Sequence, residues 1–295
     1  MNPHGPRPSA CSPMRRLKSL ALLAGTLFLH APGSLQAQTS VADEMIDPSN
    51  GTRVEIQSIF DPMPPSGYAP LRIIATNGRD QGAVWSFDFS SQTQEYRQNN
   101  THSSTFAMQL PGLSTQTAQF LLPLAVHYGN GSSYWNNSRS LSITLNGPAY
   151  KTYSHHDSLT DEFPAIAISK PLSVGNMEAL KEELEDRKSG RSGGNNQFGC
   201  VFKPEEAPED WLGYSGFDYL LLSDADWQRL KPGAQQALLQ WVRFGGQLHF
   251  YIQGSRPPDL PADASVFGLG KIQTFTWQGT RLPARETVGR YWKEA

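Results

Sequence analysis

The chain has 295 residues, enough for two domains of roughly 100–200 residues each. Charged residues make up 18% of it, below the usual ~25%, and the formal net charge is −2. No run of Lys or Arg follows the N-terminus, so the composition gives no reason to expect a nucleic-acid partner.

The N-terminal segment, 1–37, has the order of a secretory signal peptide. A positive stretch, MRRLKS (14–19), precedes the apolar run LALLAGTLFLHA (20–31), which is shorter than the ~20 residues that span a bilayer. Small residues follow, with Ala37 at the expected cleavage point, and Met14 is the better start for such a signal. We therefore expect cleavage rather than an uncleaved anchor. The mature protein is then exported, either periplasmic or membrane-associated on the outer side of the inner membrane.

Cleavage leaves Cys200 as the only cysteine, so an internal disulfide is excluded and the fold must depend on its apolar core. Cys11 does not follow the apolar run, which argues against a lipid-anchor cysteine. No later segment has eighteen consecutive apolar residues, so we expect no transmembrane helix in the mature chain as given.

Behind a flexible N-terminus, 38–52, the segment 53–147 has the alternation of β-strands. Trp85, Phe87 and Phe89 share one face of AVWSFDFSS, while Ser86 and Asp88 share the other. The same period recurs in RVEIQSIF, LRIIATN, STFAMQLPG, QFLLPLAVHYG and SLSITLNG, which are separated by turn residues. Six or seven short strands in about a hundred residues predict an immunoglobulin-like β-sandwich without a disulfide.

One loop of this domain, YGNGSSYWNN (128–137), raises the alternative of a glycan-binding protein. Tyr134 and Trp135 are aromatic side chains in a polar loop, where they would stack on sugar rings. Turn formation explains most of the same residues without a ligand. Asn99, Asn130 and Asn136 lie in N-x-S/T sequons, which matter only in a host that glycosylates.

Residues 148–162 have no apolar period and are predicted to form an interdomain linker. Within it, His155, His156 and Asp157 are residue types that bind metals. Adjacent side chains on an extended chain point in opposite directions, and no second His or Cys cluster completes a set of ligands. We therefore expect no metal site.

The segment 163–280 alternates strands with helices, which predicts a parallel sheet with right-handed crossovers. Asn176 and Asp224 are candidate helix caps, Pro232 suits a first helical turn, and Gly245 suits a C-terminal cap. The remaining tail, 281–295, has no clear stop to the fold, which leaves open a continuation into a membrane anchor. The expected strands are 163–171, 198–203, 217–224, 247–253 and one or two within 265–277, and the expected helices are 176–188 and 232–244.

The stretch DWLGYSGFDYLLLSDADWQRLKPGAQQALLQWVRFGGQLHFY resembles the class I glutamine amidotransferase-like domain of bacterial envelope proteins. The shared pattern is a Trp-x-Gly-Tyr loop, a Phe-Asp strand, a short helix, and Ala-Leu-x-x-Trp-Val-x-x-Gly-Gly before a strand. The resemblance covers about 160–280, is most specific in 211–251, and implies a flavodoxin-like fold. It also implies, for active members, a Cys nucleophile on a tight turn with a late His and Glu.

This chain departs from the active pattern. Cys200 is followed by strand residues, Ser255 by a Pro pair, and no His follows His249. We therefore expect no catalytic residue and no cofactor. The resemblance then implies a non-enzymatic scaffold that acts through an envelope protein partner. A Cys- or Ser-dependent amidase or hydrolase, using Cys200 or Ser255, is the alternative.

Open α/β sheets bind ligands beyond the carboxyl ends of their strands. This rule marks one edge of the predicted sheet as the place where a ligand would lie, without assigning a site. The residues at this speculative ligand edge are Ser169, Lys170, Lys203, Ser223, Asp224, Gln253 and Gly254.

Overall fold

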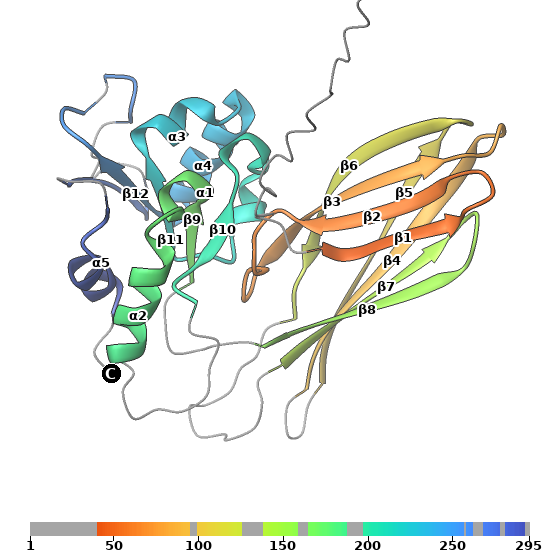
Figure 1. Cartoon of the computed structure of the whole chain (residues 1–295), viewed down its shortest axis with the longest axis horizontal. Helices are drawn as coiled ribbons and strands as arrows, with labels where there is room; N and C mark the ends of the chain where they lie inside the picture. Colours follow the sequence, from red (N-terminus) through yellow and green to blue (C-terminus); the bar gives the residue numbers. More distant parts are fainter. Residues whose placement is uncertain are drawn as a thin grey trace, which may run out of the picture. The chain divides into compact units, whose positions relative to one another are not determined.

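The computed structural model describes residues 40–94, 99–125, 138–158, 165–187, 197–256, 258–261, 268–277 and 281–292. All of them belong to one compact unit, Gln36–Ala295. Two antiparallel sheets and one parallel sheet make up most of the regular structure (Figure 1). None of the helices described is both long and apolar enough to cross a membrane.

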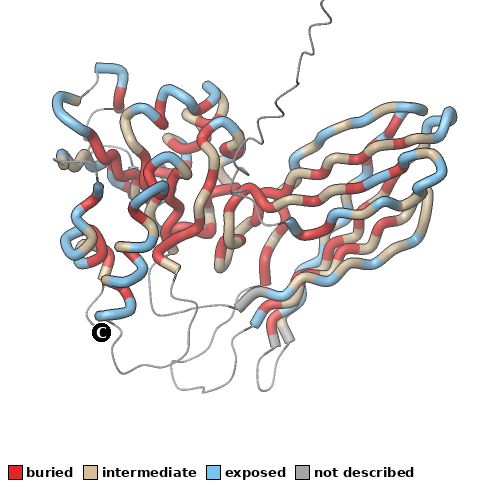
Figure 2. The backbone as a smooth tube through the Cα atoms, viewed as in Figure 1, coloured by how far each residue is buried: buried red, intermediate tan, exposed pale blue. Residues whose placement is uncertain are grey.

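The first region is a sandwich of two four-stranded antiparallel sheets, ordered β1-β2-β3-β6 and β5-β4-β7-β8. Side chains from both sheets form one core, which includes Ile56, Ile73, Phe87 and Ile143. Along β2, β3 and β7, buried residues alternate with partly exposed ones, as the sequence pattern predicts (Figure 2). The strands are β1 (Ser40–Asp47), β2 (Thr52–Ser58), β3 (Tyr68–Asn77), β4 (Ala83–Gln94), β5 (Asn99–Leu110), β6 (Ser114–Pro123), β7 (Ser138–Asn146) and β8 (Lys151–Ser158).

The second region is a five-stranded parallel sheet in the order β10-β9-β11-β12-β13. Its central strands are buried along β9, along β11 except at its end residues and along β12 except at its first residue, because structure covers both faces (Figure 2). The strands are β9 (Ile166–Ser169), β10 (Cys200–Phe202), β11 (Tyr219–Ser223), β12 (Gln247–Ile252) and β13 (Lys271–Thr276). The helices are α1 (Lys170–Ser173), α2 (Met177–Arg187), α3 (Asp224–Arg229), α4 (Pro232–Arg243) and α5 (Ala284–Tyr291), with short 3₁₀ turns η1 (Pro204–Glu206) and η2 (Trp211–Tyr214).

The fold class expected from the sequence, an immunoglobulin-like sandwich joined to a flavodoxin-like α/β domain, is wrong. The described chain is a β-rich fold of three sheets with few helices. Two of the four connections in the parallel sheet explain the difference. Between β10 and β11 the chain forms only 3₁₀ turns, and between β12 and β13 the described residues include no helix. The long, Pro-rich connectors account for this, because each proline removes a helical hydrogen bond.

Three segments expected to be irregular contain regular structure. β1 lies in the expected flexible N-terminus, β8 lies in the expected linker, and α5 lies in the expected C-terminal tail. β1 and β8 are edge strands of their sheets, and much of each strand is polar, so the apolar alternation is weak. The expected cap Asp224 is the first residue of α3, and Ser223 caps that helix instead.

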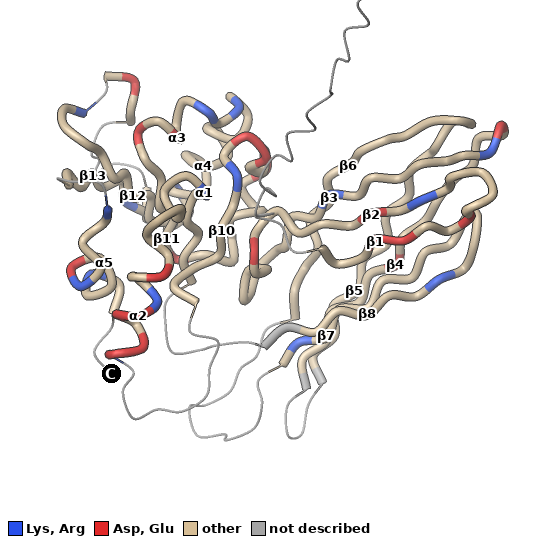
Figure 3. Tube along the Cα trace, in the orientation of Figure 1, with Lys and Arg blue, Asp and Glu red and all other residues tan. Residues whose placement is uncertain are grey.

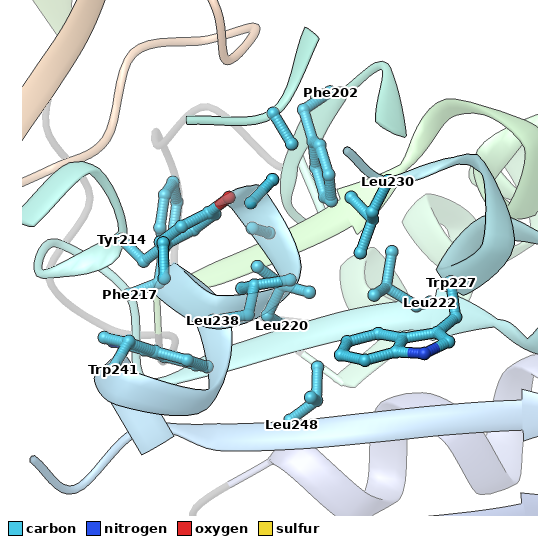
Figure 4. Close-up of a cluster of buried hydrophobic side chains, with 14 of the residues drawn as sticks. Phe202, Tyr214, Phe217, Leu220, Leu222, Trp227, Leu230, Leu238, Trp241 and Leu248 are labelled. Carbon is cyan, nitrogen blue, oxygen red and sulfur yellow. The ribbon is translucent and has the colours of Figure 1, made fainter. Parts of the chain in front are cut away.

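The two faces of the parallel sheet have different cores, because alternate residues of each strand point to opposite sides. On the first face, the α4-side core, side chains from η2, β11, α3, α4 and β12 converge in an apolar cluster (Figure 4). On the second face, the α5-side core, α1, α2 and α5 contribute Leu172, Leu180, Leu184, Val288 and Tyr291.

The sandwich and the parallel sheet share the α4-side core. Phe60, in the connection between β2 and β3, is fully buried there, with ring centroids 4.7 Å from Phe217 and 5.3 Å from Phe202. Asp61 and Val201 exchange two backbone hydrogen bonds, of 2.9 and 2.7 Å. The two regions are therefore joined by packing and not only by the chain.

Candidate functional site

The residues of the expected ligand edge follow or end strands of the parallel sheet, and two of them bond Asp226. That a ligand binds at this edge stays a prediction. Ser169 ends β9, Ser223 ends β11, and both hydroxyls donate to one carboxylate oxygen of Asp226, at 2.5 and 2.7 Å. The same two hydroxyls accept backbone N–H groups at the starts of α1 and α3. This serine–aspartate cluster closes the edge between the two strands.

The remaining residues of that edge belong to different elements. Lys203 follows β10 and pairs with Glu206, with 3.5 Å between Nζ and Oε2. Lys170 begins α1, and Asp224 begins α3. Gln253 and Gly254 follow β12 and are exposed. The structure thus joins Ser169 and Ser223, and it does so through a residue that the sequence pattern did not single out.

Asp226 could have been found from the sequence. Ser223-Asp224-Ala225-Asp226 has the spacing of a capping box. In such a box the first residue's hydroxyl accepts the N–H of the residue three positions later, and that residue's side chain accepts the N–H of the first. The structure shows both bonds, and Asp226 is completely buried.

Cys200 lies in β10 and is buried, as the strand pattern predicts. His249, in β12, is separated from it by β9 and β11, or about 14 Å at ~4.8 Å per strand. The two side chains also belong to opposite faces, since Cys200 is in the α4-side core whereas His249 contacts Tyr291. A Cys–His pair at these positions would not bring the sulfur and the imidazole within hydrogen-bonding distance.

His249 belongs instead to a buried polar chain on the α5 side. Its Nδ1 lies 2.8 Å from the Tyr291 hydroxyl, which lies 2.8 Å from the Tyr251 hydroxyl. Arg290 donates from Nη1 to Tyr251 at 3.0 Å and from Nη2 to Glu286 at 3.0 Å. This series of hydrogen-bonded side chains leads from His249 in β12 to Glu286 on the exposed side of α5.

Burial is the main cause of the pKa shifts of the side chains in this buried polar chain. It lowers the pKa of His249 to about 4, helped by the Arg290 cation, so the imidazole is neutral at pH 7. It also raises the pKa of Tyr251 and of Tyr291, so both phenols keep their protons. The polar chain is therefore uncharged except at its outer end, where Arg290 lies.

A cavity of about 150 Å³ adjoins the outer end of the polar chain, beside the carboxyl ends of β12 and β13. Its walls are aromatic, apolar and polar side chains from β12, β13 and α5. The lining residues are Tyr251, Phe275, Thr276, Trp277, Pro283, Glu286, Thr287 and Arg290. Helix α5 could have been predicted, because Ala284, Val288 and Tyr291 recur at helical spacing.

The sequence also suggested candidate residues for a metal site, a serine nucleophile and a glycan-binding loop. Burial alternates along β8, where His155 is half-buried and His156 is exposed, and the residues described contain no cluster that could hold a metal. Ser255 lies in an exposed turn after Gly254. Tyr134 and Trp135 lie outside the described residues, so the glycan-binding alternative stays a prediction.

An exposed apolar surface lies near the end of α4. Phe244 is 59% exposed and packs on Trp211 of η2, with 4.6 Å between ring centroids. Leu269 is 83% exposed, and its N–H bonds the carbonyl of Arg243, the residue before Phe244, at 3.2 Å. Single exposed apolar residues are ordinary, but contiguous ones are typical of contact surfaces. We call these three residues the Trp211 surface.

No family model matches this chain, and no curated protein matches it. Among solved structures, it is similar to a transglutaminase from red sea bream, with 11% identity over 40% of this chain and 18% of that chain, and a TM-score of 0.27. It is also similar to a protein from Archaeoglobus fulgidus, with 11% identity over 36% and 94% and a TM-score of 0.26. A protein from Arabidopsis thaliana gives 10% identity over 45% and 89%, with a TM-score of 0.25.

The chain spans less than a fifth of the length of the transglutaminase. All three TM-scores are too low to support an argument about fold or function. None of the three is named as a glutamine amidotransferase, so the resemblance in 211–251 stays a prediction.

Proposed function

We propose that this protein is an exported, non-enzymatic protein of the bacterial envelope that acts as a scaffold for a protein partner. The signal-like segment 1–37 supports export. The resemblance of 211–251 to domains of envelope proteins supports the location.

The Trp211 surface is the observation that carries the proposal. Trp211 and Phe244 belong to the most specific part of the resemblance, 211–251. Phe244 is exposed, while Trp211 is partly buried and packs against the α4-side core. Aromatic residues are enriched in the buried centres of protein interfaces. Charged residues of both signs are scattered over the rest of the described surface (Figure 3), which argues against a partner recognised by bulk charge.

The proposal is tested by affinity capture from envelope extracts, comparing the native protein with a Phe244→Ser, Leu269→Ser variant. We expect one partner to be captured in defined stoichiometry by the native protein and at least ten-fold less by the variant. Val174→Ser is the matched control, since Val174 is exposed and no residue of the Trp211 surface adjoins it in sequence. If all three proteins capture the same set in the same amounts, the Trp211 surface is not the contact.

The competing hydrolase hypothesis makes a separate prediction about Cys200. A buried strand thiol should label slowly with a thiol probe in the native state and fast after unfolding. Fast native labelling, together with an activity lost in Cys200→Ala, would contradict the scaffold proposal.

A further inference from the structure

We propose that the cavity between β12, β13 and α5 binds a small carboxylic acid with a flat apolar body, whose carboxylate pairs with Arg290. This cavity lies in a different part of the molecule from the Trp211 surface. Its size, its walls and the charge at its edge support the proposal.

The size of the cavity limits the ligand to about one ring. Its volume is about 150 Å³, and it is partly open, with more polar than apolar wall. A closed apolar cavity of about that volume accepts one benzene molecule, so one ring that carries a polar group is about the largest ligand that would fit. Tyr251, Phe275 and Trp277 supply aromatic walls, with Pro283 beside them. Such walls favour a flat apolar ligand over a fully hydrated ion.

Arg290 is held in position at the edge of the cavity. Its guanidinium carbon lies 3.7 Å from the centroid of the Phe275 ring, and Nη1 bonds the Tyr251 hydroxyl. This stacking and this bond fix the plane of the guanidinium, so less conformational entropy is lost when a carboxylate pairs with it. Arg290 itself is mostly buried, with 24% of its side chain exposed.

Glu286 occupies the position of the ligand carboxylate in the structure. Its Oε1 accepts the Nη2 hydrogen bond from Arg290, but 68% of its side chain is exposed. Because the Glu286 carboxylate is exposed, water and salt screen its pairing with Arg290. A ligand carboxylate can therefore displace Glu286 while Glu286 turns toward solvent.

The local charge also favours an anion. The segment 281–292 contains Arg281, Arg285 and Arg290 against the single carboxylate of Glu286. Within the cavity wall, Arg290 is a donor only, and the hydroxyls of Thr276 and Thr287 can donate as well, which matches the acceptor-only carboxylate.

Benzoate is the probe that matches this description, and benzamide is its uncharged counterpart. Titration of the full-length mature protein, followed by calorimetry or NMR, should show benzoate binding at least about ten-fold tighter than benzamide, since a hydrogen bond to a charged group is worth more than a neutral one. Equal affinity for the two compounds, or no binding of benzoate at millimolar concentration, would overturn the proposal.

Two variants test the role of the charges in opposite directions. Arg290→Gln should weaken benzoate binding by about ten-fold or more. Glu286→Gln should strengthen it by about three-fold, because it removes the competing carboxylate. Arg285→Gln removes a charge from the same helix outside the cavity and should change affinity by less than about two-fold. If Arg290→Gln does not fold, unchanged or weaker binding in Glu286→Gln is sufficient to reject the proposal.

A free acid and the C-terminus of a peptide present the same carboxylate, and the size of the cavity favours the free acid. N-acetylphenylalanine distinguishes the two sources, because it carries the carboxylate on a peptide-like body. It should bind more weakly than benzoate. Tighter binding would overturn the assignment to a free acid.

Discussion

The two faces of the parallel sheet differ in what they bury. The α4 side buries Leu, Phe and Trp side chains and continues into the sandwich through Phe60, with few polar groups inside (Figure 4). The α5 side buries a chain of hydroxyl and imidazole groups that ends at Arg290 and a cavity. A dry, close-packed face stabilises the fold, whereas a face that buries polar groups must satisfy each one. The comparison assigns stability mainly to the first face and ligand chemistry to the second.

The largest expected effect is on the α4 side. Phe60→Ala should lower the free energy of unfolding by about 3–5 kcal/mol, because it removes a buried ring and leaves a cavity between the two regions. Urea unfolding measures the loss. Met45→Ala, at an exposed position of β1, is the control and should cost less than about 0.5 kcal/mol. A loss below about 1 kcal/mol in Phe60→Ala would show that the shared core is not tightly packed.

On the α5 side, the next effect depends on pH. His249 has a pKa of about 4 in the fold against 6.5 when unfolded, so between these values the unfolded chain binds more protons. Stability is therefore complete above pH 6.5 and falls as the pH drops toward 4, by roughly 3 kcal/mol from this residue.

The variant His249→Phe isolates this contribution, because it keeps an aromatic ring and removes the titrating group. Unfolding curves at several pH values between 4 and 7 should decline less steeply for the variant than for the native protein. Parallel curves would show that His249 does not titrate as its burial predicts.

Elements with a local sequence pattern could be predicted, whereas elements without one could not. The sandwich strands β2 to β7 follow from alternation, and Cys200 follows from its strand context, because each signal is local. The two expected helices, 176–188 and 232–244, correspond to α2 and α4. The α/β pattern also implies a helix in every crossover, but the described residues of the connectors before β11 and β13 contain only 3₁₀ turns or no helix. The edge strands β1 and β8 have too few apolar residues to show a period.

The candidate site was the least predictable part. Tyr251, Arg290 and Trp277 are distant in sequence and meet only because α5 returns to the ends of β12 and β13. Their residue types are also common in cores and on surfaces, so none indicates a ligand by itself. Ser169 and Ser223 were predicted only as residues of a possible ligand edge, and their bonds to Asp226 are visible only in the structure.

Two matched tyrosine variants sharpen the contrast between the faces. Tyr291→Phe removes a hydroxyl that bonds both His249 and Tyr251, and leaves a buried imidazole nitrogen without its partner. Tyr214→Phe, on the α4 side, removes one bond to the Pro208 carbonyl, of 2.6 Å. We expect losses of about 2 kcal/mol and about 1 kcal/mol respectively, measured by urea unfolding at pH 7. A larger loss for Tyr214→Phe than for Tyr291→Phe would show that buried hydrogen bonds contribute more to stability on the α4 side than on the α5 side.

The smallest expected effect is at the junction between the sandwich and the α4 side. Arg72 of β3 donates to Glu206 of η1 at 3.0 Å, and both side chains are largely covered. A double-mutant cycle with Arg72→Gln and Glu206→Gln should give a coupling energy of about 1 kcal/mol or less, which decreases with added salt. Coupling above about 3 kcal/mol would mean that this ion pair rivals Phe60. The junction would then be held by charge as much as by packing, and the simple division between an apolar face and a polar one would fail at the point where the two regions meet.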